Sequence, residues 1–263
     1  MNPTLRLVLV PALLLALAAP LRADDTPADA PAATPTVDVD GGRFVVFSHG
    51  EPVATETFRY RRHDDSLFVL SDVHRNARGH NGAPSPYLKH LAMVLRASDG
   101  ELLGYSTLER FDGHDVQRTL IVSDTAVTVN TQKDQYGTAD KVVRPPGRFH
   151  VMDPGVFELF DVLARDLHGR VFGPRPVGLV TLGEQTASVE ATVEPAGRDT
   201  LRWGARTVKV ERLSLTDSSS TFVLTLSPTG QLLRLESAAA DLVVLREPPA
   251  ADTAPRRRRP APR

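Results

Sequence analysis

The sequence predicts a mainly β protein: a curved antiparallel sheet, or incomplete β-barrel, of about a dozen strands with one amphipathic α-helix packed on its concave side. Three observations predict this class. Turn signals recur between apolar-rich runs at hairpin spacing, several runs alternate apolar and polar residues, and one segment has helical periodicity instead. The predicted turns are Gly50-Glu51-Pro52, Ser98-Asp99-Gly100, Asp112-Gly113, Pro195-Ala196-Gly197 and Pro228-Thr229-Gly230.

The clearest strand signal is the run Thr186 to Glu194, which alternates with period two. Such alternation is typical of an antiparallel strand with one buried face. The run after Thr221 repeats the pattern. The residues predicted to face inward are Ala187, Val189, Ala191, Val193, Phe222, Leu224 and Leu226.

Other runs depart from simple alternation. Between Ala205 and Leu215 the apolar phase slips, which a β-bulge near Glu211-Arg212 explains. Leu67–Leu70 and Leu91–Leu95 are apolar on both faces. We therefore expect these two strands to lie in the interior of the sheet.

One segment indicates a helix of about fifteen residues. Asp153 is a good N-cap, Pro154 suits the first helical position, and Gly169 ends the pattern. Asp161 and Arg165 are four residues apart on the polar side. The apolar side consists of Val156, Phe157, Phe160, Leu163 and Leu167.

The amino terminus has the pattern of a cleavable secretory signal over residues 1–23. A short basic start is followed by an apolar run, Leu7 to Ala19, which is too short for a transmembrane helix. Small residues place cleavage after Ala18 or Ala23. The mature chain is therefore expected to be periplasmic or secreted, with no transmembrane segment.

The rest of the chain is organised as one domain. Residues 24–37 are rich in Pro, Ala and Asp and predict a disordered linker. Residues 38–247 form the single β-rich domain, and 248–263 form a disordered tail rich in Pro and Arg. There is no cysteine, which excludes disulfides and a bacterial lipobox.

Charge limits the partners. Residues 38–247 hold 24 basic and 28 acidic side chains, a balance that argues against nucleic-acid binding. The tail is the exception, because it contains four consecutive arginines. These are either a solvated end or a contact for an anionic membrane surface or an envelope protein. They are Arg256, Arg257, Arg258 and Arg259.

Catalytic signatures are absent from the sequence: it has no Gly-x-Ser-x-Gly elbow, phosphate-binding glycine loop or His-Glu-x-x-His motif. Asp72 and His74 share one face of a strand, which could begin a metal site, but a pair of surface neighbours is the favoured interpretation. The loop from Arg75 to Pro86 contains two arginines and His80, which could receive an anionic group, but its composition favours a flexible surface segment. No enzyme activity, cofactor or metal is predicted, and a hydrolase built on His74 and His80 ranks last.

The predicted helix decides whether the interior is a solid core or a ligand cavity. A strongly curved sheet whose concave side carries valine and alanine needs a helix either to fill that space or to cover it. In the first case the interior is a solid core, and in the second it is a cavity for acyl chains. The candidate ligand-binding residues are Phe157, Phe160, Leu163, Val189, Ala191, Phe222 and Leu224.

The signal sequence, the hairpins of long strands, the apolar helix and the late hairpin from Phe222 to Glu236 together resemble the lipoprotein-carrier superfamily typified by LolA and LolB. The resemblance covers roughly Gly41 to Glu247 as a pattern, and no single binding residue transfers. It implies an incomplete barrel with an apolar interior that holds acyl chains. The carriers have more than one helix, whereas this chain shows one.

The function expected from these observations is non-catalytic binding of a lipid or other apolar ligand by an exported protein. The alternative is a structural or interaction module of the cell envelope with a solid core, acting through strand edges or its arginine tail.

Overall fold

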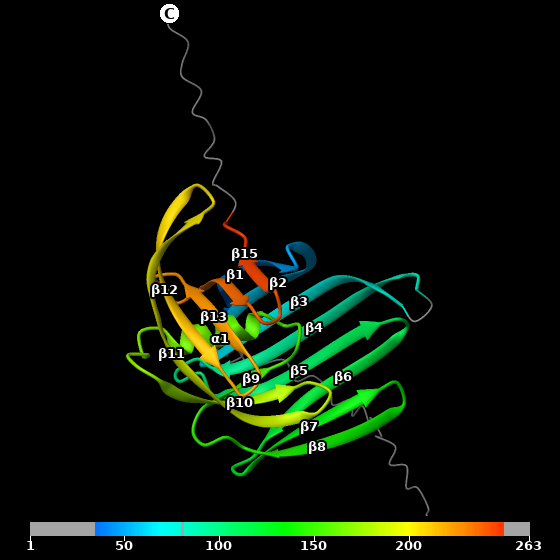
Figure 1. Cartoon of the computed structure of the whole chain (residues 1–263). Helices are drawn as coiled ribbons and strands as arrows, with labels where there is room; N and C mark the ends of the chain where they lie inside the picture. Colours follow the sequence, from blue (N-terminus) through cyan, green and yellow to red (C-terminus); the bar gives the residue numbers. More distant parts are fainter. Residues whose placement is uncertain (1–34, 80–81, 250–263) are drawn as a thin grey trace, which may run out of the picture. The chain divides into compact units, whose positions relative to one another are not determined.

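The computed structural model describes residues 35–79 and 82–249 (Figure 1). The chain divides into two units, 1–34 and 35–263, and only the second contains described residues. The predicted signal peptide, the linker up to residue 34, His80 and the arginines of the tail lie outside these residues. The first strand begins at Val37, one residue before the predicted domain boundary.

The described residues form fifteen strands and one helix, α1 (Glu158–Leu167). The strands are β1 (Val37–Ser48), β2 (Glu51–His63), β3 (Ser66–Arg78), β4 (Pro84–Arg96), β5 (Leu102–Phe111), β6 (His114–Val122), β7 (Ala126–Lys133), β8 (Tyr136–Val143), β9 (Phe149–Met152), β10 (Arg175–Leu182), β11 (Thr186–Trp203), β12 (Arg206–Thr216), β13 (Thr221–Leu226), β14 (Leu232–Ser237) and β15 (Leu242–Arg246).

All fifteen strands belong to one sheet, in the order β8-β7-β6-β5-β4-β3-β2-β1-β15-β14-β13-β12-β11-β10-β9. Strands that follow each other in sequence are paired, except β8 and β9, which lie at the two ends of this order, and β1 pairs with β15 to join the two halves of the chain. These pairs are antiparallel apart from β9–β10, a parallel pair whose crossover contains α1. A parallel pair needs such a crossover because a tight turn cannot return the chain to the same direction.

The sheet is an open, barrel-like structure, which confirms the predicted fold class. Its two end strands, β8 and β9, form no ladder with each other in the described part of the chain. The strand number exceeds the predicted dozen. Strand β8 illustrates why, because every residue except Val142 is exposed, so the strand carries no apolar alternation.

The helix lies within the curve of the sheet (Figure 1) and contacts β9, β13 and β14. Its apolar side joins the core of the sheet, which is dominated by Val and Leu with the stacked rings of Phe44 and Phe58, 4.7 Å apart. The helical residues buried there are Leu159, Leu163, Ala164 and Leu167.

The helix begins later than predicted. Asp153 is not its N-cap, because the regular turns start at Glu158 after a turn at Pro154-Gly155 in which Gly155 has φ +80°. A left-handed backbone at this position favours glycine and interrupts the helix. The Asp153 side chain instead pairs with residues of β4 and β5. The end agrees with prediction, since Gly169 adopts φ +68° just beyond Leu167.

One predicted turn is also wrong. Pro195-Ala196-Gly197 lies inside β11, where the register with β12 shifts between Pro195 and Gly197. The segment is therefore a β-bulge, and the turn occurs later, between Trp203 and Arg206. The bulge lies opposite Arg212 and Leu213 of β12, where the apolar pattern of the sequence changes phase. The bulge predicted near Glu211-Arg212 therefore exists, but its extra residue is on β11 and not on β12.

Leu163 tests how firmly α1 is packed on the sheet. Its side chain is fully buried, so we expect Leu163→Ala to lower the free energy of unfolding by about 2–5 kcal/mol through lost contacts and a residual cavity. Leu103→Ala, at a half-exposed position of β5, should change it by less than about 0.5 kcal/mol. Urea unfolding followed by circular dichroism measures both. Equal losses would contradict this packing.

Candidate functional site

A pocket of about 750 Å³ lies at the end of the sheet where the turns β1–β2, β3–β4, β5–β6, β10–β11 and β14–β15 gather. Its lining comes from the strand ends beside these turns and from the segment that leads into α1. The lining residues are Val46, Ser48, Val53, Ala54, Val73, Arg75, Asn76, Tyr87, Lys89, Glu109, Arg118, Asp153, Pro154, Gly155, Phe157, Leu182, Gly183, Glu184 and Leu242.

The walls of this pocket are largely apolar. Val46, Val73 and Leu182 are buried members of the main core, and Phe157 and Leu242 pack against it. Val46, Leu182 and Leu242 lie at or near the ends of β1, β10 and β15, and Phe157 lies just before α1. A volume of this size falls within the range of small-molecule sites, about 300–1,000 Å³.

The floor of the pocket is charged. The Lys89 side chain is only 2% exposed and lies between two carboxylates. Its Nζ is 2.5 Å from Oδ1 of Asp153, donates to the carbonyl of Pro154 at 3.2 Å, and lies 3.8 Å from Glu109. The second oxygen of Asp153 accepts a hydrogen bond from the Tyr105 hydroxyl at 2.8 Å. Charges at this depth need such partners, because desolvation otherwise makes them unstable.

Two arginines add to the polar surface, which also includes Ser48, Asn76 and Glu184. Arg118 pairs with Glu109 at 3.4 Å. Arg75 is exposed and lies over the Tyr87 ring, 4.4 Å from its centroid. Burial and the nearby Glu109 carboxylate raise the pKa of Tyr87, so its phenol stays neutral and can donate. The pocket therefore presents apolar walls beside paired cations, the exposed guanidinium of Arg75 and the exposed carboxylate of Glu184.

The start of α1 is held by a carboxylate from the sheet. Glu56 of β2 is fully buried and accepts hydrogen bonds from the backbone N–H groups of Phe157, at 2.7 Å, and Glu158, at 3.2 Å. The Ser71 hydroxyl donates to it at 2.5 Å. Glu56 thus performs the capping role predicted for Asp153, from a distant strand. Burial raises its pKa from 4.5 to about 7.

Two further acidic groups lie beside it. Asp161 is fully buried and accepts from the Tyr60 hydroxyl at 2.9 Å, Arg165 at 2.7 Å and the Leu232 N–H at 2.5 Å. Glu158 is also buried, yet neither of its carboxyl oxygens has a hydrogen-bond partner within the described residues. Burial and the neighbouring Asp161 and Glu56 raise the pKa of Glu158 well above its usual value.

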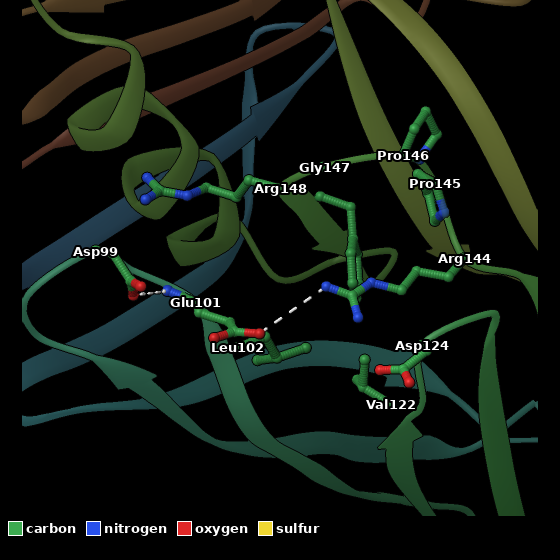
Figure 2. A pocket seen from close by; sticks show the side chains of 11 residues that line it. Asp99, Glu101, Leu102, Val122, Asp124, Arg144, Pro145, Pro146, Gly147 and Arg148 are labelled. Atoms are coloured by element: carbon green, nitrogen blue, oxygen red, sulfur yellow. Dashed lines mark hydrogen bonds and ion pairs between the residues drawn. The ribbon is translucent and has the colours of Figure 1, made fainter.

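A second pocket, of about 390 Å³, lies at the opposite end of the sheet (Figure 2). Figure 2 shows Arg144 reaching towards Glu101, 3.9 Å away, while Arg148 points towards the helix and pairs with Asp166. Its polar groups are thus largely used within the fold. We take the first pocket as the candidate site.

The predicted ligand-binding residues separate into two groups. Leu163, Ala191 and Leu224 are fully buried in the core. Phe160 and Phe222 are partly buried and pack against each other, with ring centroids 5.0 Å apart, and Val189 also packs against the core. Phe157 alone among these residues lines the candidate pocket.

The polar floor of the pocket was not predicted from the sequence. Its signal was present, because Lys89 occupies an inward position between Tyr87 and Leu91, and Glu56 one between Ala54 and Phe58. A charged residue at an inward position of a strand indicates a buried partner. Which partner it finds depends on pairing across the fold.

Asp72 and His74 do not form the pair considered for a metal site, and His80 lies outside the described residues. Asp72 pairs with His90 across β3 and β4 at 2.5 Å, in an exposed position, instead of joining His74. Within residues 35–79 and 82–249 no three His, Asp or Glu side chains are grouped as a metal site requires. Within the same residues no helix has the length and apolarity to cross a membrane.

The fold and the pocket define a β-barrel-like protein. Among solved structures, the chain is similar to a β-barrel-like protein of the domain of unknown function DUF1849 from Brucella abortus. The two are 8% identical with a TM-score of 0.53, and the similarity covers 81% of this chain and 95% of that chain. At this identity the likeness shows the fold alone. No family model matches the chain, and no curated protein matches it.

The raised pKa of Glu56 makes the stability of the protein depend on pH. Its carboxyl has a pKa of about 7 in the folded protein against 4.5 when exposed, so folding favours the protonated form. The resulting stabilisation is complete below pH 4.5 and is lost as pH rises through 7. At 1.36 kcal/mol per pKa unit, the loss is about 3 kcal/mol.

Glu56→Gln removes this titration and keeps an oxygen for the helix N–H groups. As pH rises from 4.5 to 8, we expect the unaltered protein to lose about 3 kcal/mol of unfolding free energy relative to the variant. Urea unfolding at several pH values measures it. Glu51→Gln, at an exposed position, is the matched control. A constant difference across this range would contradict the assigned role.

Proposed function

We propose that this is an exported, non-catalytic binding protein that holds a lipid-like amphiphile in the pocket formed by Val46, Val73, Lys89, Phe157 and Leu242. The observation that carries the proposal is the union of apolar walls and a buried ion pair in one hollow of about 750 Å³. The proposed export depends on the signal pattern of residues 1–23.

The apolar walls suit an alkyl chain, because each buried methylene contributes about 0.8 kcal/mol. The ion pairs of the floor are already satisfied, so they offer no free charge to a ligand. Arg75 at the rim has no carboxylate partner within the described residues. A carboxylate or phosphate head group at the rim would match it.

The resemblance to lipoprotein carriers supports binding of acyl chains. In this chain the helix packs on the sheet through Leu159, Leu163 and Leu167, and space remains at one end of the sheet instead of beneath the helix. We therefore infer that the ligand occupies the end of the sheet. The alternative, an interaction module with a solid core, is favoured by the dense packing at Leu163 and Leu224 and is the opposing outcome of the test.

The first measurement is the binding of cis-parinaric acid, a fluorescent fatty acid, to the full chain. The second is native mass spectrometry of the freshly purified full chain, which detects lipid that co-purifies. Ala54→Trp places an indole at an inward position of the pocket wall. It should weaken binding at least tenfold, because the alkyl chain loses its space. Ala92→Trp is the matched control, since Ala92 is exposed on the outer face of β4.

Equal affinity of Ala54→Trp and the unaltered protein would exclude the pocket as the binding site. Absence of both bound probe and co-purified lipid would favour the interaction module. The melting temperatures of the two variants separate loss of the site from loss of the fold.

A further inference from the structure

The hairpin between β11 and β12 extends beyond the sheet as a separate arm, residues 197–210 (Figure 1). Strand β10 pairs with β11 only as far as Val193, and β13 pairs with β12 only from Glu211. Between these limits the two strands pair with each other alone. An isolated two-stranded hairpin is marginally stable, so a feature of this kind needs an additional support.

The support is on the apolar face of the arm. Leu201 is paired with Val208, and Trp203 beside them donates its indole N–H to the carbonyl of Arg246 at 3.0 Å. Gly204 at the turn approaches Pro248 so closely that a Cβ there would lie 3.1 Å from that ring. The arm is therefore fixed against the end of β15 and does not move freely.

The opposite face of the arm is basic. Strand alternation and register place Arg198, Arg202 and Lys209 on this face, and all three are exposed. At the base of the arm the register also places Glu211 opposite Arg198, and the Glu211 carboxylate pairs with His168 at 3.4 Å. Within the described residues none of the three side chains has an ion pair or hydrogen bond. Elsewhere in the fold arginines such as Arg165 and Arg246 are paired with carboxylates. We name this surface the basic arm.

The positive charge is local. The arm has four basic residues, Arg198, Arg202, Arg206 and Lys209, against the single acid Asp199, whereas residues 38–247 together carry a small acidic excess. The sequence beyond Pro249 adds Arg256–Arg259 with the same sign. Unpaired cations held on a rigid, exposed face attract anionic surfaces, and each cation near such a surface adds to the binding free energy.

We propose that the basic arm docks this protein on an anionic lipid bilayer. The proposal does not depend on the ligand of the pocket, because the arm and the pocket share no residue. Strand β11 starts near the pocket at Thr186, and its far end, at Trp203, lies in the arm. A bilayer suits the arm better than nucleic acid does, because the three cations form one small patch on an otherwise acidic domain. Nucleic acid needs a longer basic surface.

The experiment is sedimentation of the full chain with vesicles at low ionic strength. One set of vesicles is phosphatidylcholine alone and the other is an equal mixture with phosphatidylglycerol. We expect binding to the mixed vesicles only, and loss of binding as salt rises. The triple variant Arg198→Gln, Arg202→Gln, Lys209→Gln should bind the mixed vesicles about a hundredfold more weakly, from about 1 kcal/mol per basic residue.

The matched control removes three exposed cations elsewhere: Arg59→Gln, Lys133→Gln and Lys141→Gln. It has the same net charge as the arm variant and should retain most of the binding. A third variant changes Arg256–Arg259 to Gln and separates the tail from the arm.

Equal loss in the arm variant and the control would overturn the proposal, because net charge alone would then explain binding. Full binding by the arm variant, or loss only in the tail variant, would overturn it as well. Tighter binding to duplex DNA than to mixed vesicles would assign the arm to a different polyanion. Unchanged circular dichroism of the variants excludes misfolding as the cause.

Discussion

The arrangement of this protein depends on buried carboxylates that join the helical segment to the sheet. Glu56 of β2 accepts the first N–H groups of α1, Asp161 accepts from β2 and β14, and Asp153 accepts from Lys89 of β4 and Tyr105 of β5. Apolar packing alone would hold the helix in the curve of the sheet without fixing its rotation. These directional contacts fix both its rotation and the point at which it begins.

The same contacts explain why the interior is filled and one end is hollow. Since Asp153 is drawn to Lys89, the chain makes a glycine turn at Gly155 and the helix starts at Glu158. The turn shortens the helix, and the residues before it line the pocket in place of a further helical turn. The buried ion pair of Lys89 and Asp153 thus lies in the lining of the pocket beside apolar side chains.

The pocket and the basic arm lie at the two ends of β11, which is the longest strand. The bulge at Pro195-Ala196-Gly197 lies between them and marks where β11 leaves its pairing with β10. One strand therefore contributes both to the packed barrel and to an arm that projects from it. The pocket and the arm can therefore be altered independently, because no side chain belongs to both.

The sequence alone determined the fold class, most of the hairpin turns, the existence of the helix and the inward set Ala187 to Val193, because these follow from local periodicity. The buried face of the helix was predicted only in part, since Asp161, expected on the polar side, is fully buried by partners from the sheet. The start of the helix, the bulge on β11, the parallel pair β9–β10 and the polar floor were decided by the tertiary structure. Asp153 looks like an N-cap locally, but Lys89 and Tyr105, distant in sequence, compete for its carboxylate. Glu56 and Lys89 were visible as charges in strands, and only the pairing of the strands shows what they hold.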